Sequence, residues 1–439
     1  MRMYISNLFI KLPVMFVVLV YLMSMQISSA PYLFIAIINA FLVINEFFSS
    51  EERPYTLHKI INFFILFFFI LANAVQFSTN SIVTSLSISF NEYDYVFFQI
   101  LVLAIVVFFN LFYHFFINIA VEFHIRQENN CINQKRLLML STIAFILVLI
   151  YYSNQISRLF FRGFAENMNV SSNINSSTIN LLFNKFIRSF PFACLYIALT
   201  KNAPKWCIVL LFIETLIAIF PLGLPRNSVA MYWIPIMIVC FRFFNKKYFF
   251  GLILSFSLLI LFPFLDNFRN YNGNISFSSI NLDYLNTMNF DASQEFMALI
   301  HYDVITYGRQ LLGVLFFWVP RSIWVEKPVG SGFFLAQNQN AFTNISMPFF
   351  AEGFINFGYI GMFMFTIGLS FFCASFDNAF WEKKMNQKAH LWSGYYLLLI
   401  GGGVFVMRGD LLSSFAYIVG IALAYFFCKK IACYKSNCL

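Results

Sequence analysis

Residues 96–120 read VFFQILVLAIVVFFNLFYHFFINIA, and this run contains no Asp, Glu, Lys or Arg. A helix needs about 20 apolar residues to cross the hydrocarbon core of a bilayer, so the run predicts a membrane-spanning helix. The rest of the chain has the same character. Of its 439 residues, 60% are hydrophobic and 11% are charged, whereas soluble domains carry about 25% charged residues. We therefore expect an integral membrane protein.

Other segments qualify, or nearly qualify, as spans, which predicts an all-α polytopic fold with about 12 transmembrane helices. Together with 96–120 they are 8–25, 31–48, 60–77, 137–152, 179–200, 206–222, 229–244, 248–265, 349–372, 391–407 and 411–428. In chain order, the fifth span (137–152) and the eighth (229–244) are short, and the sixth (179–200) carries charge. The first lacks a small-residue cleavage site, so we expect it to stay in the protein as a span.

This pattern divides the chain into three parts: spans in 1–265, one long loop in 266–348, and the last spans with a short tail in 349–439. Within the loop, 293–318 shows apolar residues at helical spacing. Phe296, Leu299, Ile300 and Val304 would share one helix face, with Glu295 and Asp303 on the other. We interpret 293–318 as a helix that lies on the membrane surface or covers the bundle.

The basic residues predict the orientation. If the amino terminus is cytoplasmic, the cytoplasmic segments hold 17 of the 28 Lys and Arg residues, the far side holds eight and the spans hold three. Both termini are then cytoplasmic, and the long loop lies on the far side of an inner membrane. This distribution explains the net charge of +9 without nucleic acid. All eight cysteines fall in spans or cytoplasmic segments, which predicts no disulfide.

The far-side cations are mostly arginines. Seven of the eight are Arg: Arg158, Arg162, Arg226, Arg269, Arg309, Arg321 and Arg408, with Lys327 as the eighth. Arg binds phosphate through two parallel hydrogen bonds and keeps its charge in a partly dry site. The excess of Arg predicts a diphosphate-binding surface; the alternative is chance combined with side chains that reach the membrane interface.

Two cations lie inside the sixth span, Lys185 and Arg188, and their spacing of three places them on one helix face. A charge at membrane depth usually faces a polar interior, which makes both candidates for the diphosphate site. The alternative is that both side chains extend to the far interface.

Several far-side groups could act as a general base. The candidates are His301, Asp266 and Asp410, together with Glu352, which lies beside Gly353 at the edge of a span and could instead form an ion pair with an arginine. The long loop has no DxD motif, so we expect neither a metal nor another cofactor in catalysis. The absence of Walker A, GxSxG and HExxH motifs argues against ATP-driven transport and hydrolase classes.

Three stretches carry a resemblance to a known family: VPRSIWVEKP at 319–328, NISMP at 344–348 and EGFINFGYIG at 352–361. They resemble the large-loop signature of bacterial O-antigen polymerases of the Wzy class. The predicted topology and the Arg-rich periplasmic edge are similar as well. The resemblance implies that Arg269, Arg321 and Glu352 are catalytic, and that Arg226, Arg309, Lys327 and Arg408 assist with the diphosphate.

The resemblance also implies an activity. Such a glycosyltransferase moves a growing glycan from undecaprenyl diphosphate onto the non-reducing end of another lipid-linked repeat unit. It would have a fold related to the lipid-dependent class of glycosyltransferases, invert the anomeric centre, need no metal and work with a chain-length regulator protein as partner.

Two alternatives remain open. An O-antigen ligase uses the same donor with a lipid A-core acceptor, and segment 320–324 favours the polymerase over it. A lipid-linked oligosaccharide flippase also has about 12 spans but would show two related halves and no long one-sided loop, neither of which fits this sequence.

Overall fold

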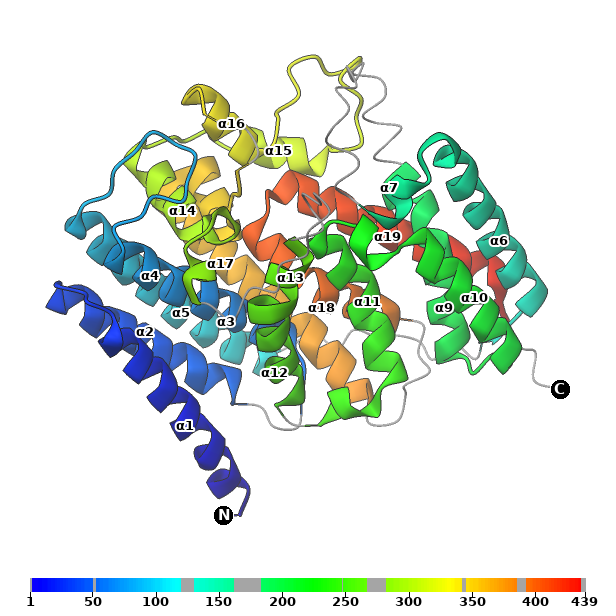
Figure 1. Cartoon of the computed structure of the whole chain (residues 1–439), viewed down its shortest axis with the longest axis horizontal. Helices are drawn as coiled ribbons and strands as arrows, with labels where there is room; N and C mark the ends of the chain where they lie inside the picture. Colours follow the sequence, from blue (N-terminus) through cyan, green and yellow to red (C-terminus); the bar gives the residue numbers. More distant parts are fainter. Residues whose placement is uncertain are drawn as a thin grey trace.

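The computed structural model describes residues 2–49, 53–119, 130–161, 183–246, 248–266, 282–341, 345–384 and 392–435. These residues form helices packed side by side, with α1 (Arg2–Ser24) at one edge and α6 (Gln134–Tyr151) at the other (Figure 1). The strands β1 (Asn130–Ile132) and β2 (Cys433–Lys435) are three residues long and pair antiparallel. The expectation of an all-α fold is confirmed.

One long helix runs through the middle of the bundle: α3 (Leu57–Phe64), the π-helical η1 (Ile65–Leu71) and α4 (Ala72–Ser78). It begins at Thr56, whose hydroxyl accepts a hydrogen bond from the Lys59 amide at 3.0 Å and so caps the helix. Its best apolar window is 89% buried inside the protein. The helices α2 (Ala30–Phe47) and α5 (Glu92–Ile119) pack beside it.

The middle of the chain forms shorter helices. They are α6 (Gln134–Tyr151), η2 (Ser153–Gln155), α7 (Ser157–Phe160), η4 (Ile187–Ser189), α9 (Phe190–Thr200), α10 (Lys205–Ala218), η5 (Pro221–Gly223), α11 (Arg226–Cys240), η6 (Arg242–Asn245), α12 (Phe249–Phe256), η7 (Ser257–Leu261) and α13 (Phe262–Asp266). Between α13 and the last spans lie η8 (Leu282–Leu285), η9 (Met288–Phe290), α14 (Ala292–His301), α15 (Arg309–Leu315) and α16 (Ser331–Asn338).

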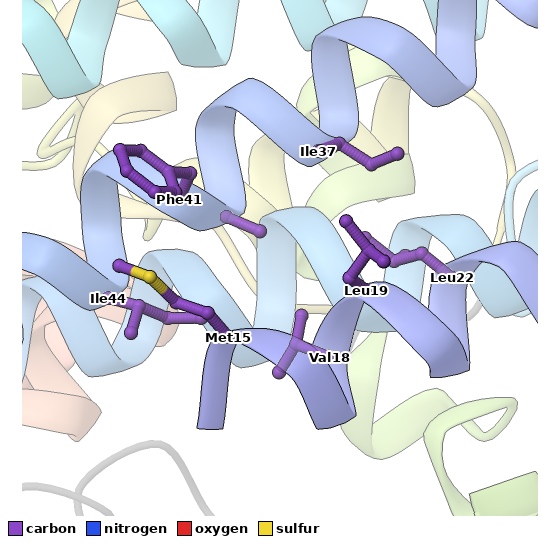
Figure 2. Close-up of a pocket in the computed structure, with 8 residues that line it drawn as sticks. Met15, Val18, Leu19, Leu22, Ile37, Phe41 and Ile44 are labelled. Atoms are coloured by element: carbon purple, nitrogen blue, oxygen red, sulfur yellow. The ribbon is translucent and has the colours of Figure 1, made fainter. Parts of the chain in front are cut away.

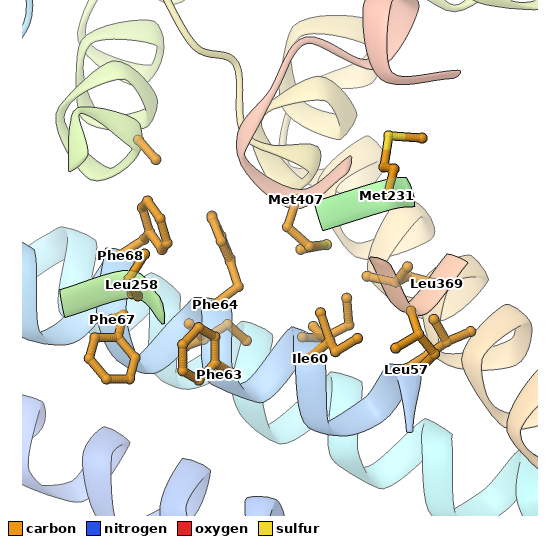
Figure 3. Close-up of a cluster of buried hydrophobic side chains, with 14 of the residues drawn as sticks. Leu57, Ile60, Phe63, Phe64, Phe67, Phe68, Met231, Leu258, Leu369 and Met407 are labelled. Atoms are coloured by element: carbon orange, nitrogen blue, oxygen red, sulfur yellow. The ribbon is translucent and has the colours of Figure 1, made fainter. Parts of the chain in front are cut away.

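Three long helices complete the bundle: α17 (Phe349–Lys384), α18 (Ser393–Arg408) and α19 (Leu411–Ala432). The pairs α5–α17, α11–α18 and α3–α18 are in close contact, so segments from both ends of the sequence share one core. Figure 3 shows this core, where Phe64 and Ile60 of α3 lie near Met231 of α11 and Met407 of α18. Close packing of these side chains fixes the position of α3 among its neighbours.

Seven helices of the described residues are long and apolar enough to cross a membrane, and three shorter apolar helices accompany them. Their outer faces are also apolar, since Leu111 of α5 and Ile150 of α6 are 58% and 62% exposed. The multi-pass membrane architecture is thus plausible. The count of about 12 is only partly matched, because α9 and α11 are shorter than a full span.

The tenth predicted span is not one straight helix. Phe357 and Gly358 have non-helical backbone angles, and Gly358 has a φ of 63°, so the first two turns of α17 are bent sharply against the rest. A Cβ at Gly361 would overlap the carbonyl oxygen of Gly353, which shows how closely the two parts approach. The bend separates a short helix containing Glu352 from the long remainder of α17.

The predicted helix 293–318 is also interrupted. It ends at His301, Asp303 adopts a left-handed φ of 47°, and a second helix, α15, begins at Arg309. The expectation that Glu295 faces away from the core was wrong, because its side chain is fully buried. Since α14 packs on α4, α5, η1 and α17, it covers the bundle.

Candidate active site

The turn between α18 and α19 is the centre of a polar cluster. Arg408 is the last residue of α18, and Asp410 caps α19 by accepting a hydrogen bond from the Ser413 amide at 3.3 Å. Asp410 also accepts from the Gly332 amide at 3.2 Å, and the position of Gly330 leaves no room for a Cβ beside its carboxylate. The turn is therefore held against the start of α16.

Glu352 lies next to this turn and is almost fully buried, with an exposed fraction of 1%. Its Oε2 accepts from the Ser331 hydroxyl at 2.7 Å, and its Oε1 accepts from the Leu411 amide at 2.9 Å. Both carboxylate oxygens are thereby satisfied by the first residues of α16 and α19, where helix amides favour negative charge. Glu352 makes no ion pair among the described residues, so the ion-pair alternative from the sequence is not supported.

A short segment, residues 327–332, connects Arg321 to both carboxylates, and we call it the strap. Arg321 is exposed and donates from Nη1 to the Lys327 carbonyl at 2.8 Å and from Nη2 to the Pro328 carbonyl at 3.3 Å. Lys327 in turn donates to the Val319 carbonyl at 2.9 Å. The guanidinium fork of Arg321 thus fixes one end of the strap, and Ser331 and Gly332 fix the other.

Arg408 makes the ion pair of the cluster. Its Nη2 lies 3.0 Å from Asp291 Oδ1 and 2.9 Å from the Met288 carbonyl oxygen, while Asp291 also accepts from the Ser346 hydroxyl at 2.7 Å. The Nε of Arg408 is buried and has no hydrogen-bond partner among the described residues. Arg408 therefore keeps unused donor capacity beside the α18–α19 turn.

Arg226 also contacts η9, the segment to which Arg408 bonds. It donates to the Tyr284 hydroxyl at 2.8 Å and to Asn289 Oδ1 at 2.6 Å. Because Met288 bonds to Arg408 and Asn289 bonds to Arg226, the two arginines meet at η9. The structure thus brings Arg226 and Arg408 together at one end of the bundle, where both guanidinium groups bond to protein atoms.

A further buried carboxylate lies one helical turn beyond Asp291. Glu295 Oε1 accepts from the Thr84 hydroxyl at 2.8 Å, whereas Oε2 has no hydrogen-bond partner within the described residues. Burial, and then the negative charge of Asp291, raise the pKa of Glu295 well above its usual range. A carboxyl group in this environment favours its protonated form.

Burial and neighbouring groups also shift the pKa values of ionisable residues in the α18–α19 turn and the strap. Burial raises the pKa of Asp410 above its usual value, and the backbone amides around the carboxylate oppose that shift. Burial, and then the positive charge of Arg321, lower the pKa of Lys327. Asp410 is thereby a better proton acceptor near neutral pH than an ordinary Asp, and the strap carries a concentrated positive charge.

Lys185 and Arg188 are buried apart from each other. The ammonium of Lys185 lies 3.3 Å from the Tyr417 ring centre and 3.4 Å from the Ser228 hydroxyl. Arg188 instead donates to the Ala218 carbonyl and to the Tyr152 hydroxyl. Neither side chain reaches the surface, and the two do not share the single helix face that their spacing predicted, because a turn and the 3-10 helix η4 interrupt the span.

The remaining candidates lie outside the cluster. Arg309 is exposed and contacts Glu326, with 3.9 Å between their charged atoms, and His301 is exposed at the end of α14. Asp266 ends α13, and nothing is described of its side chain. Arg269 lies outside the described residues. Its predicted catalytic role therefore stays a prediction.

Sequence patterns missed several members of the cluster. Ser346 lies within the family-like stretch 344–348 and Ser331 lies three residues after the stretch 319–328, but neither serine was singled out from the sequence. The spacing of Asp291 and Glu295, four residues apart, is the one local signal that these acids share a helix face. The contacts with the α18–α19 turn join residues about 60 to 120 positions apart and leave no local pattern.

Comparison of the chain with models of protein families, with curated proteins and with solved structures finds no match in any of the three.

An apolar crevice of about 50 Å³ lies between α1 and α2, away from the polar cluster. Figure 2 shows its wall, which includes Met15 and Leu22 of α1 and Ile37 and Phe41 of α2. It presents no charged or hydrogen-bonding side chain. Because its lining residues offer no polar group to orient a ligand, the crevice is unsuited to the polar part of a substrate.

Proposed function

We propose that this chain is a glycosyltransferase of the inner membrane, an O-antigen polymerase that transfers a glycan from undecaprenyl diphosphate to a lipid-linked repeat unit. The observation that carries the proposal is the strap. It joins a guanidinium, Arg321, to two carboxylates, Glu352 and Asp410, beside Arg408. All four belong to stretches that either resemble the family signature or form the short loops in which the sequence predicts diphosphate binding.

The cations suit a departing diphosphate. Transfer of a sugar from a lipid diphosphate develops negative charge on the leaving phosphate, and preorganised cations stabilise that charge. Arg321 and Lys327 supply positive charge at the surface, and the free Nε of Arg408 supplies a buried donor. In this proposal these groups neutralise the leaving diphosphate without a metal at this site.

Of the two carboxylates, Asp410 is the better general base. Glu352 has an exposed fraction of 1%, and each of its oxygens accepts a hydrogen bond, whereas Asp410 is half-buried and its hydrogen bonds are long. Glu352 then acts as a positioning residue that fixes the strap and the α18–α19 turn.

In the proposed reaction, each proton and each bond that changes is accounted for. The acceptor hydroxyl loses its proton to Asp410 while its oxygen bonds to the anomeric carbon of the donor glycan. The bond from that carbon to the diphosphate oxygen breaks, and undecaprenyl diphosphate leaves with both electrons. Attack from the face opposite the diphosphate inverts the anomeric centre, as the resemblance implies.

The test is the lipopolysaccharide ladder of a strain that lacks this gene. We expect a single repeat unit on the lipid A-core, and restoration of the ladder by the native gene. Bare core would favour the ligase or the flippase, and an unchanged ladder would contradict the proposal.

The same strain tests the assignment of the base. Asp410→Asn should restore the ladder about 100-fold less efficiently than the native gene, because general-base catalysis contributes about that much. Glu352→Gln keeps an acceptor for Leu411 and a partner for Ser331, so we expect a loss of only about tenfold. Immunoblots of the membrane fraction control for protein level, and full activity of Asp410→Asn would contradict the assignment.

A further inference from the structure

Three metal-ligating side chains meet at the opposite end of the bundle from Arg408. They are Glu46 near the end of α2, His58 in the first turn of α3 and His114 near the end of α5. His114 Nε2 lies 2.8 Å from Glu46 Oε2, and His58 Nε2 lies 3.8 Å from the same oxygen. One donor atom from each residue lies within 4.8 Å of the other two.

The distance from the proposed active site follows from the central helix. His58 lies at one end of the α3–η1–α4 helix, and Gln76 at the other end donates to the Phe290 carbonyl of η9 at 3.0 Å. Eighteen residues of helix span roughly 27 Å. The cluster of Glu46, His58 and His114 is therefore separate from the α18–α19 turn.

We propose that Glu46, His58 and His114 bind a divalent transition-metal ion of the zinc type. Two imidazoles and one carboxylate are a common donor set for zinc, with bonds of about 2.0–2.2 Å. Donor atoms around such an ion are on the order of 3.4 Å apart. The separations of 2.8 and 3.8 Å lie on either side of that value, so small side-chain adjustments bring the donors to bonding distance.

The buried histidine is held in place before any ion binds. The backbone amide of His58 donates to Asp377 Oδ2 at 3.2 Å, and its ring stacks on Tyr113 with centres 3.9 Å apart. Its Nε2 lies 2.7 Å from Asn110 Oδ1. The same nitrogen lies 3.2 Å from Asn62 Nδ2, so an ion bound at Nε2 replaces these two contacts. Fixed ligands with supporting contacts are what a metal site requires.

His114 gives an ion access to the proposed site from the surface. The side chain of His114 is 50% exposed, whereas those of His58 and Glu46 are 2% and 18% exposed. An ion can thus enter from the surface, and a water molecule can complete its coordination. Because the ligands come from α2, α3 and α5, a bound ion ties three helices together at this end of the bundle.

A simpler explanation is a hydrogen-bonded ion pair between His114 and Glu46 alone. That pair leaves His58 to its hydrogen bond with Asn110, although its buried Nε2 also lies 3.8 Å from the same carboxylate oxygen. The nearest cation on α1, Lys11, donates to the Asn45 amide oxygen at 3.0 Å. The two explanations differ in what His58 contributes, and metal titration separates them.

The test uses the full chain purified in detergent, stripped with EDTA and titrated with Co²⁺ as a spectroscopic substitute for Zn²⁺. We expect one equivalent of Co²⁺ to bind, with a visible d–d spectrum that added Zn²⁺ abolishes. His114→Gln, at the half-exposed position, should weaken binding at least about tenfold without loss of folded protein, because one of three ligands is removed. His58→Gln should do the same, which the ion-pair explanation does not predict.

The matched control is His301→Ala, which removes an exposed histidine outside the cluster. It should bind Co²⁺ like the native chain. Absence of a stoichiometric Co²⁺ spectrum, or equal loss in His114→Gln and His301→Ala, would overturn the proposal. The readout is metal binding, so it is independent of whether the chain polymerises glycans.

Discussion

Arg321 shows what a single side chain contributes at the strap. Its two terminal nitrogens donate to two consecutive carbonyls, and a lysine has no planar fork to do so. We therefore expect Arg321→Lys to lower polymerisation about tenfold or more, since a hydrogen bond to a charged group contributes about 1.5–3 kcal/mol. The measurement is the ladder intensity in the deletion strain at equal protein level.

Arg309→Lys is the control for that variant. Arg309 is 61% exposed, its one carbonyl contact is 3.3 Å long and its partner Glu326 is 86% exposed. Such a surface pair contributes little, so the lysine variant should polymerise normally. Normal polymerisation by Arg321→Lys would mean that its charge alone matters, and equal losses in the two variants would mean that the loss does not come from the contacts with the strap.

Glu295 makes stability depend on pH. Its folded pKa is raised, so the folded protein binds the proton more tightly than the unfolded chain, whose Glu pKa is about 4.3. This contribution to stability is present at low pH and is lost as pH rises from about 4 toward the folded value. The Glu295→Gln variant has no carboxyl group at this position, so it does not lose stability in this way as pH rises.

The thermal midpoint of Glu295→Gln in detergent should therefore rise relative to the native chain as pH increases from about 4 to 7. Glu326→Gln removes an exposed carboxylate and should show no such divergence. If the thermal midpoints of Glu295→Gln and the native chain changed in parallel with pH, ionisation of Glu295 would cost the folded protein little stability.

Individual site residues were predictable only in part. Arg226, Arg321, Glu352, Arg408 and Asp410 stand out because charge is scarce in this sequence, and the structure connects all five through η9, the strap and the α18–α19 turn. Ser331 could not be found in this way, since a loop serine carries no signal of its own. The pairing of Glu46 with His58 and His114 likewise has no counterpart in sequence spacing.

At the scale of elements, the bend of α17 decides where Glu352 lies. It requires a glycine at Gly361, where a Cβ would overlap the Gly353 carbonyl. Gly361→Ala should lower the free energy of unfolding by at least about 2 kcal/mol through overpacking. Gly368 lies in the same helix with open space around it, so Gly368→Ala should be neutral or stabilise by up to about 1 kcal/mol.

Thermal midpoints of the two alanine variants in the same detergent measure this difference. If Gly361→Ala were as stable as Gly368→Ala, the two parts of α17 would not approach as described. Glu352 would then be free to move away from Ser331 and Leu411.

The sequence predicted helices well where a long apolar run defines them. It predicted bends and interruptions poorly, because these depend on the backbone angles of single residues. Each span predicted before residue 160 corresponds to a helix, with ends that differ by at most six residues, because a long apolar run in lipid has no other stable form. The bend at Gly358 and the interruption at Asp303 depend on single backbone angles. Apolar periodicity continues across both positions, so the sequence pattern could not reveal them.

At the scale of the whole molecule, the bundle presents different chemistry at its two ends. Arginines and carboxylates from loops and helix starts gather at the α18–α19 turn, whereas Glu46, His58 and His114 lie at the opposite end. The central helix, almost wholly buried, connects the two ends. The charge distribution predicts that the α18–α19 end faces the periplasm, where lipid-linked repeat units would be joined.

The central claim is tested most directly with the purified full chain and the lipid-linked repeat unit isolated from the deletion strain. We predict that incubation in EDTA yields undecaprenyl-linked oligomers of two or more repeats, because Arg and Lys side chains neutralise the leaving diphosphate. Mass spectrometry of the lipid-linked products gives the measurement. Failure to extend the repeat unit in EDTA, with extension restored by magnesium and not by one equivalent of zinc, would contradict the arginine-based mechanism. No extension under any of these conditions would contradict the assignment as a polymerase.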